Sequence, residues 1–275
     1  MKKNNDIKIL TIKEIQELQL ELMKKVHSFL QEHEITYYML GGSALGAVRH
    51  QGFIPWDDDI DIGMFRNDYE KFINFIGEFD KKYSVLNFKN AKNCDYALTR
   101  IYIPNTRVDN KIIEKTKLEK RLYFDIFPLD NVPENADVRA KYEKQIYGKK
   151  MLMARIDARD NGNSKITMLI KNLISFALSP FRNCILKSTD RLMKKYDNIE
   201  TSLICSLHSQ YSFKKQVMPK EIYGTPVLYK FEDSAFYLPE KAEEYLTILY
   251  GKDFMEVPPK NKRRPIPTVY LTDKD

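Results

Sequence analysis

The feature that most constrains this chain is a group of four aspartates within five residues, followed by an alternating apolar segment. Positions 56 to 62 read WDDDIDI. Alternate side chains of a strand share a face, so Asp59 and Asp61 point one way while Ile60 and Ile62 point into a core. Asp57 has the same parity. Carboxylates this close repel one another, and hard divalent cations neutralise them through oxygen ligands. The pattern predicts a strand that carries a metal site.

A glycine-rich turn, Gly41-Gly42-Ser43, precedes the aspartates. Two glycines let the backbone approach a phosphate, and a helix that starts there supplies free N–H groups. Ser43 and Arg49 can donate hydrogen bonds to the same phosphate. An ordinary turn would explain the glycines alone, but clustered aspartates destabilise a strand unless they are neutralised. The combination favours a site for a nucleotide and a metal.

Length and composition restrict the class of protein. A chain of 275 residues with 43% hydrophobic residues can bury a sizeable core and is not disordered. Its net charge of +7 suits an anionic partner, yet no aromatic-basic RNA motif is present, so we expect no nucleic acid. Scattered cysteines, and the lack of a signal peptide or long apolar segment, indicate a cytoplasmic location. Contact with the inner face of the cell membrane stays open.

Periodicity and composition change near residue 135. Thr11 and Glu14 form a capping-box pattern before a helix, and short strand patterns follow it. Beyond that point most segments have helical patterns, with a hairpin expected over 222–238 and a helix over 240–250 that ends at Gly251. We therefore expect an α+β fold with a catalytic core over residues 1–135. A mostly helical part over 136–275 would pack on that core.

The segment 165–195 combines apolar residues at helical spacing with a basic rim. A basic amphipathic helix can lie on an anionic membrane. Amphipathic helices of globular proteins more often turn their apolar face to the core. The pattern therefore favours a core-facing helix with a solvated basic rim, and a membrane-surface helix is the alternative.

The central stretch GGSALGAVRHQGFIPWDDDIDIGMFRNDYEKF resembles the hallmark motif of the LicD family of bacterial phosphocholine transferases. The resemblance continues at 97–100 (ALTR), 104–106 (PNT), 123–130 (YFDIFPLD) and 245–263. Fukutin-related ribitol-phosphate transferases are more distantly similar, and both groups resemble the nucleotidyltransferase superfamily. The resemblance implies a polymerase-beta-like core, which is a small mixed sheet with helices against it.

The same resemblance implies roles for individual residues. Asp59 and Asp61 would be the metal pair, Asp57 a further ligand, and Asp125 the third carboxylate from a neighbouring strand. Asp125 has an alternative interpretation, as the ion-pair partner of an arginine such as Arg100. We predict catalytic roles for Asp59, Asp61 and Asp125, a Mg²⁺ or Mn²⁺ site at these three and Asp57, and substrate binding by Gly42, Ser43, Arg49 and Arg100. Asp130 is interpreted as a turn residue.

The resemblance also implies a reaction. The enzyme would move phosphocholine from CDP-choline to a hydroxyl of a cell-surface glycan precursor of teichoic acid, lipopolysaccharide or capsule type, and release CMP. The metals would neutralise the phosphate oxygens, and Asp61 or Asp125 would take the hydroxyl proton. Alternatives are a ribitol or glycerol CDP-alcohol donor, a conventional nucleotidyltransferase, or a non-enzymatic nucleic-acid binder, which is disfavoured. The donor alcohol, the acceptor and whether a lipid carries it, the general base and the oligomeric state stay open.

Overall fold

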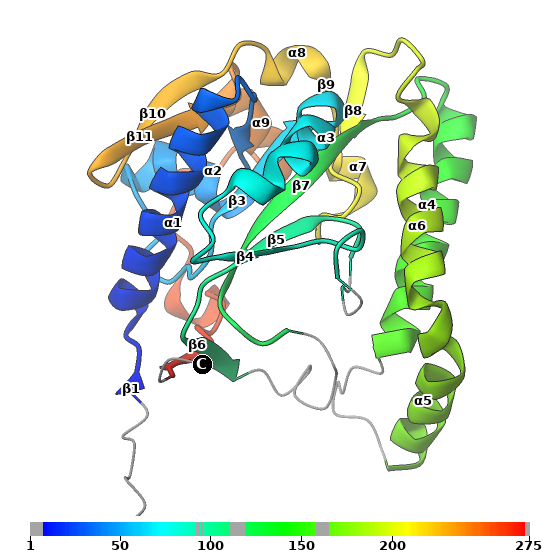
Figure 1. Cartoon of the computed structure of the whole chain (residues 1–275). Coiled ribbons are helices and arrows are strands. Elements are labelled where there is room, and N and C mark those ends of the chain that lie inside the picture. Colours follow the sequence, from blue (N-terminus) through cyan, green and yellow to red (C-terminus); the bar gives the residue numbers. More distant parts are fainter. Residues whose placement is uncertain (1–7, 92–93, 95, 110–118, 158–164, 273–275) are drawn as a thin grey trace, which may run out of the picture.

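A mixed β-sheet forms the centre of the fold (Figure 1). The structure is a computed structural model that describes residues 8–91, 94, 96–109, 119–157 and 165–272. The sheet has the order β2-β3-β7-β5-β4, with β8 and β9 added beside the far end of β7. β3 and β7 run parallel, whereas the neighbouring pairs are antiparallel. The strands are β2 (Tyr38–Met39), β3 (Asp61–Phe65), β4 (Ser84–Leu86), β5 (Thr99–Tyr102), β7 (Tyr123–Asn131), β8 (Leu203–Cys205) and β9 (Val217–Pro219).

Helices from the first half of the chain pack against this sheet. They are α1 (Ile12–Glu32), α2 (Gly41–His50), α3 (Arg66–Phe75) and the short 3₁₀ turn η1 (Ile76–Glu78). The predicted capping box is confirmed, because the backbone N–H of Glu14 donates to Oγ1 of Thr11 at 3.3 Å. α3 lies against β3 and β7, and the apolar face of α1 joins the same core (Figure 1). The sheet and these helices therefore share one hydrophobic core.

The second half of the chain contains strands as well as helices. Its helices are α4 (Ala136–Asp157), α5 (Lys165–Leu178), α6 (Arg182–Met193), α7 (Phe213–Gln216), α8 (Lys220–Tyr223) and α9 (Ala242–Tyr250), with the 3₁₀ turns η2 (Ser179–Phe181), η3 (Lys194–Tyr196) and η4 (Lys260–Lys262). The predicted hairpin is confirmed as β10 (Val227–Phe231) and β11 (Ser234–Leu238). The predicted end of α9 is also confirmed, because Gly251 follows it with φ +97°. A helical description fits this half only in part.

A second, smaller sheet ties the two ends of the described chain together. Its order is β1-β12-β6, formed by β1 (Lys8–Ile9), β12 (Thr268–Leu271) and β6 (Thr106–Asp109). Both pairings are antiparallel. The C-terminal segment therefore returns to the first half of the chain.

The expectation that the helix after residue 165 faces the core is wrong. α5 packs along α4, but Ile166, Leu169, Leu173 and Phe176 are between 61% and 82% exposed. α4 and α6 run side by side, and α5 lies at their lower end in Figure 1. Among the described residues, too few surround α5 to cover its apolar face. Among the described helices, none combines the length and the apolar character that crossing a bilayer requires.

The interpretation of Asp130 as a turn residue is also wrong. Asp130 lies inside β7 and is fully buried, where its carboxylate pairs with Nε of Arg66 at 2.6 Å. Arg66 also contacts Asp190 of α6 at 3.2 Å. A buried ion pair fixes the arrangement of its elements more than it stabilises them. This one joins α3, β7 and α6.

Candidate active site

Strand register brings three of the predicted site residues side by side. Asp61 begins β3 and faces Asp125 on the parallel strand β7. Arg100 on β5 faces Asp125 from the other side. Directly opposed residues of neighbouring strands place their side chains on the same face of the sheet. The register thus builds a row of Asp61, Asp125 and Arg100 across three strands.

A cleft of about 980 Å³ opens over this row. Asp59, Asp61, Asp125 and Arg100 line its floor, together with Gly41. α4 forms the opposite wall, and the segment 206–213 between β8 and α7 closes one side. The cleft therefore lies between the strands of the first half and the helices of the second.

Burial and mutual repulsion disturb the titration of the aspartates in this cleft. Burial is the largest cause that raises the pKa of Asp61 well above its usual range, and the charges of Asp59 and Asp125 add to it. Burial and the charges of Asp57, Asp58 and Asp125 act in the same way on the pKa of Asp59. The carboxyl groups of Asp59, Asp61 and Asp125 lie close enough that ionisation of one disfavours ionisation of the others. A bound cation would relieve this repulsion.

The loop carboxylates before the strand are affected less strongly. Burial, followed by the charge of Asp58, raises the pKa of Asp57 to about 6. Burial also raises the pKa of Asp58. Arg264, which comes from the C-terminal segment and lines the cleft, lowers the pKa of both. The pKa of both groups is nevertheless raised, because the effect of burial exceeds that of this arginine.

Arg100 is held from three directions. Its Nε donates to Oδ1 of Asp125 at 2.7 Å. Its guanidinium carbon lies 4.2 Å from the ring centre of Tyr123 and 5.3 Å from that of Tyr96. A guanidinium fixed between aromatic faces keeps its remaining N–H groups in a defined plane. The ion pair expected in the alternative interpretation of Asp125 is therefore confirmed, and it lies inside the cleft.

Two other predicted substrate-binding residues, Ser43 and Arg49, form hydrogen bonds within the protein. Ser43 is buried, and its Oγ accepts a hydrogen bond of 2.9 Å from the backbone N–H of Asp61. Arg49 donates to the carbonyl oxygens of Phe254 and Glu256, both at 2.9 Å. Neither side chain lines the cleft.

The glycines of the turn allow close approaches by their neighbours. A side chain at Gly42 would clash with Asp57, because a Cβ there would lie 2.5 Å from Oδ2 of that carboxylate. Gly41 has a φ of +51° and donates its N–H to the hydroxyl of Tyr245 at 2.9 Å. The glycine pair thus lets α2 begin directly beside the acidic loop. The substrate-binding roles of Gly42, Ser43 and Arg49 stay predictions.

The donor set of the cleft fits a hard divalent cation in its chemistry. Carboxylate oxygens are the ligands that such cations prefer, and the carboxyl groups of Asp59, Asp61 and Asp125 line one cleft. Among the described residues, no three side chains of His, Cys, Asp or Glu are close enough together to enclose a metal ion as they stand. Binding of a cation would have to draw Asp59, Asp61 and Asp125 closer together.

Sequence reasoning missed His208 as a residue of this site. Its only sequence signal is a spacing of three from Cys205, and one such pair without a second pair does not predict a zinc site. The structure places Cys205 in the buried strand β8 and His208 in the cleft wall. Neither ring nitrogen of His208 has a hydrogen-bond partner among the described residues. Burial and the charges of Lys150, Arg66 and Arg100 hold its pKa well below the usual range, so the ring is neutral.

Comparison with known proteins agrees with this geometry. Residues 34–150 match the family model described as LicD/FKTN/FKRP, nucleotidyltransferase domain. The chain is 28% identical over 269 residues to the lipopolysaccharide cholinephosphotransferase LicD of Haemophilus influenzae, covering 94% of this chain and 97% of that protein. An uncharacterised protein of Rickettsia prowazekii is 34% identical over 42% of this chain and 40% of its own length.

A shorter similarity connects the chain to an animal enzyme. The human ribitol 5-phosphate transferase FKRP is 42% identical over 48 residues, which are 18% of this chain and 10% of that protein. The matched family domain contains the row of Asp61, Asp125 and Arg100 together with Asp59. Residues 34–150 therefore form a domain similar to the LicD/FKTN/FKRP nucleotidyltransferase family, and Asp59, Asp61, Asp125 and Arg100 of the cleft all lie within it.

Proposed function

We propose that this enzyme transfers phosphocholine from CDP-choline to a hydroxyl of a cell-surface glycan precursor and releases CMP. The observation that carries the proposal is the meeting of Asp59, Asp61 and Asp125 with Arg100 in one cleft. The near full-length similarity to a lipopolysaccharide cholinephosphotransferase supports the choice of phosphocholine and of a glycan acceptor. Residues 1–135 would then form a polymerase-beta-like core, and residues 136–275 would lie on the acceptor side.

The carboxylates would hold Mg²⁺ or Mn²⁺. Asp59, Asp61 and Asp125, which line the cleft, would be direct ligands, and Asp57, in the loop beside Gly42, would be a further ligand. The bound cation would supply positive charge that neutralises the donor's phosphate oxygens. Ser43 would act as a positioning residue, since its hydroxyl holds the backbone of Asp61.

Residues of the chain itself would carry out the proton transfer and the binding of phosphate. Asp61 or Asp125 takes the proton of the acceptor hydroxyl, whose oxygen then attacks the phosphorus of the phosphocholine group. The bond from that phosphorus to the bridging oxygen breaks, and CMP leaves. Arg100 offers planar N–H groups to the phosphates, because Tyr96, Tyr123 and Asp125 fix its orientation.

A different CDP-alcohol is the second candidate donor. The similarity of a 48-residue segment to a ribitol 5-phosphate transferase motivates it. The reaction and the roles of the carboxylates would be unchanged, and only the alcohol pocket would differ. A nucleotidyltransferase reaction would instead consume a nucleoside triphosphate and release pyrophosphate.

One assay separates these candidates. Purified protein is incubated with Mg²⁺, a lipopolysaccharide acceptor and, in parallel, CDP-choline, CDP-ribitol, CDP-glycerol or CTP, while CMP and pyrophosphate are measured. We expect CMP from CDP-choline, and none after Asp61→Asn. Release of CMP only from another donor would exclude the choline assignment. Pyrophosphate from CTP would exclude the whole class of CDP-alcohol reactions.

A further inference from the structure

Helix α5 presents an apolar surface that the described part of the chain leaves uncovered. Leu169 and Leu173 are 61% and 62% exposed, Ile166 is 73% exposed and Phe176 is 82% exposed. Phe181, in the turn that follows α5, is 58% exposed. Soluble surfaces seldom expose so many large apolar side chains in one place, and such patches mark contact sites.

The length of α5 limits what the helix can enter. Its 14 residues span about 21 Å at 1.5 Å per residue, whereas the hydrocarbon core of a bilayer is about 30 Å thick. The helix is therefore too short to cross a membrane. An apolar helix of this length can lie in the plane of the interface, with its apolar side in the acyl region.

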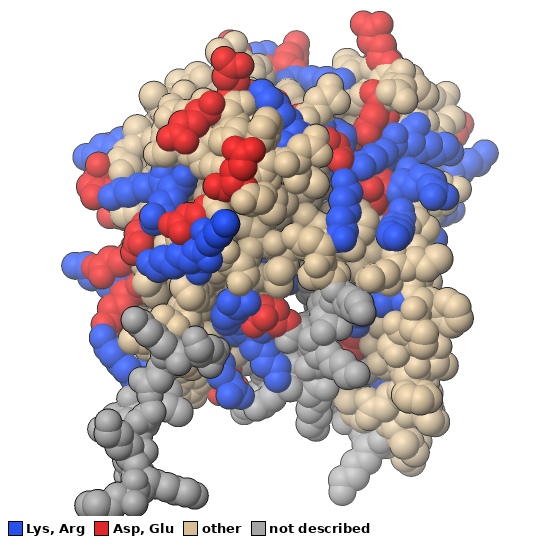
Figure 2. Space-filling model, viewed as in Figure 1, with Lys and Arg blue, Asp and Glu red and all other residues tan. Residues whose placement is uncertain are grey.

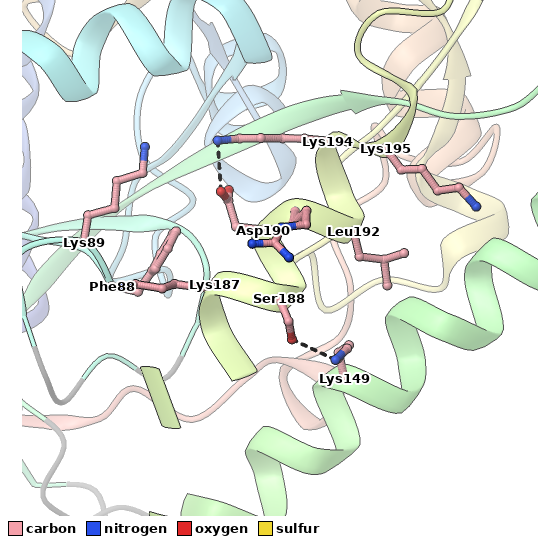
Figure 3. A pocket seen from close by; sticks show the side chains of 10 residues that line it. Phe88, Lys89, Lys149, Lys187, Ser188, Asp190, Leu192, Lys194 and Lys195 are labelled. Carbon is pink, nitrogen blue, oxygen red and sulfur yellow. Dashed lines mark hydrogen bonds and ion pairs between the residues drawn. The ribbon is translucent and has the colours of Figure 1, made fainter. Parts of the chain in front are cut away.

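A basic groove of about 920 Å³ lies beyond α5, along α6 (Figure 3). Its cationic residues are Lys89, Lys149, Lys187, Arg191, Lys194 and Lys195. Lys194 pairs with Asp190 at 2.9 Å, and Lys149 donates to Ser188 at 2.8 Å (Figure 3). Lys89 pairs with Glu70 at 2.8 Å.

The other three cations of the groove are available to an anion. Lys187, Arg191 and Lys195 are exposed. None of the three has an ion pair with a described residue. Positive charge thus remains after the internal pairs of the groove are formed.

The apolar helix and the basic groove lie on one face of the molecule. Figure 2 shows Lys and Arg side chains gathered over α6, and uncharged surface over α5 below them. The chain runs from α5 through η2 directly into α6, and both helices pack on α4, so the two surfaces follow one another along one continuous helical segment. We propose that this face docks on an anionic phospholipid bilayer, with α5 in the interface and the basic groove on the headgroup phosphates.

The position of α4 connects this surface with the cleft. α5 and α6 pack on α4, and Tyr147 and Met151 of the same helix line the cleft while they are 61% and 39% exposed. Docking would thus bring one wall of the cleft to the membrane. Under the proposed function, docking would let an acceptor carried on a lipid reach the cleft. This consequence rests on the proposed function, whereas the docking itself does not depend on it.

Vesicle co-sedimentation tests the docking. The full chain is mixed with vesicles of phosphatidylcholine alone, or with vesicles that also contain phosphatidylglycerol, at low salt and at about 0.5 M salt. We expect binding to the anionic vesicles only, weakened by salt. Inorganic phosphate added in excess should compete poorly with anionic vesicles. It can replace the contacts of the headgroup phosphates with the basic groove, but it cannot replace the contacts of α5 with the acyl region. No binding, or equal binding to both vesicle types, would overturn the proposal.

Two sets of variants assign the binding to its surface. Leu169→Glu with Leu173→Glu changes α5, and Lys187→Glu with Arg191→Glu and Lys195→Glu changes the groove. Each set should reduce the affinity for anionic vesicles, by about 100-fold for the groove. Leu228→Glu and Lys230→Glu on the exposed strand β10 are matched controls that should bind like the wild type.

Two further measurements separate the remaining outcomes. CMP release with a water-soluble acceptor should be unaffected by the α5 and groove variants, so failure of docking is distinguished from failure of the proposed reaction. Sedimentation velocity without lipid reports the oligomeric state. If the α5 variants dissociate a dimer and leave vesicle binding unchanged, the apolar face joins two copies of the chain and the proposal is wrong.

Discussion

The hydroxyl of Ser43 holds the backbone N–H of Asp61 at 2.9 Å, which joins the first turn of α2 to the first residue of β3. Both ends of this hydrogen bond belong to segments that the sequence assigns to substrate and metal. The hydrogen bond fixes the backbone position of Asp61 relative to α2. The oxygen of Ser43 is thereby engaged by a backbone N–H group of the protein.

Ser43→Ala should destabilise the protein and misplace Asp61. The variant leaves the N–H of Asp61 without its partner, which costs about 1–3 kcal/mol. The melting temperature measures the loss of stability and kcat measures the misplacement of Asp61, and both values should fall. Ser28→Ala is the control, since Ser28 lies on α1 outside the cleft and its hydroxyl donates to the carbonyl oxygen of Lys24 in the same helix at 3.1 Å. A Ser43→Ala protein with wild-type stability and a raised KM alone would instead indicate direct contact with substrate.

Asp61→Asn should abolish transfer without unfolding the protein. Loss of one carboxylate of the cleft removes a candidate base and ligand, so kcat should fall about 100-fold or more. The melting temperature should stay equal or rise, because burial and neighbouring carboxylates disfavour this charge. Asp58→Asn is the matched control, since Asp58 does not line the cleft. An equal decrease of kcat in Asp61→Asn and Asp58→Asn would argue against a specific role for Asp61.

The acidic cluster should make the metal-free protein less stable as the pH rises. A carboxyl whose folded-state pKa is raised stabilises the fold below its unfolded pKa, and this contribution is lost as the pH passes the folded-state value. That value is about 6 for Asp57, and the pKa values of Asp59 and Asp61 are raised well above their usual range. The free energy of unfolding should therefore decline across this interval.

Melting in EDTA at about pH 5.5 and about pH 7.5 measures this decline. The wild type should lose more stability between the two values than the double variant Asp59→Asn with Asp61→Asn. Addition of Mg²⁺ should raise the wild-type melting temperature at the higher pH, because a ligand that binds only the folded state stabilises it. If the melting temperatures of the two proteins change equally with pH, Asp59 and Asp61 are not the source of the decline in stability.

His208→Leu should preserve stability and weaken substrate binding. The change removes a buried imidazole whose nitrogens have no described partner, so the melting temperature should be equal or higher. A hydrogen bond from the neutral ring to a substrate would be lost, which corresponds to about tenfold in KM. His27→Leu is the contrasting control. Its Nδ1 bonds the hydroxyl of Tyr37 at 2.7 Å outside the cleft, so this variant should lose stability and keep its KM.

Local structure was predictable wherever neighbouring residues decide it. The capping box at Thr11, the hairpin before residue 239 and the end of α9 at Gly251 depend on hydrogen bonds and dihedral angles within a few residues. The parity of Asp59 and Asp61 follows from the alternation of an extended chain. Both side chains line the cleft, although β3 begins only at Asp61.

Contacts between distant segments required the tertiary structure. The parallel pairing of β3 with β7 aligns Asp61 with Asp125, and no local pattern specifies that register. The same holds for Asp130, which is buried because Arg66 from another element pairs with it. His208 enters the cleft wall because the segment after β8 folds back over the sheet.

The clustering of carboxylates behind a glycine turn can be read from the sequence, because alternation and glycine freedom are properties of the local backbone. Which surfaces are covered depends on how distant segments pack together. The apolar face of α5 has the spacing of a core helix, yet it stays exposed because nothing among the described residues packs over it. Burial depends on the whole arrangement of elements, and periodicity records only that a face is apolar.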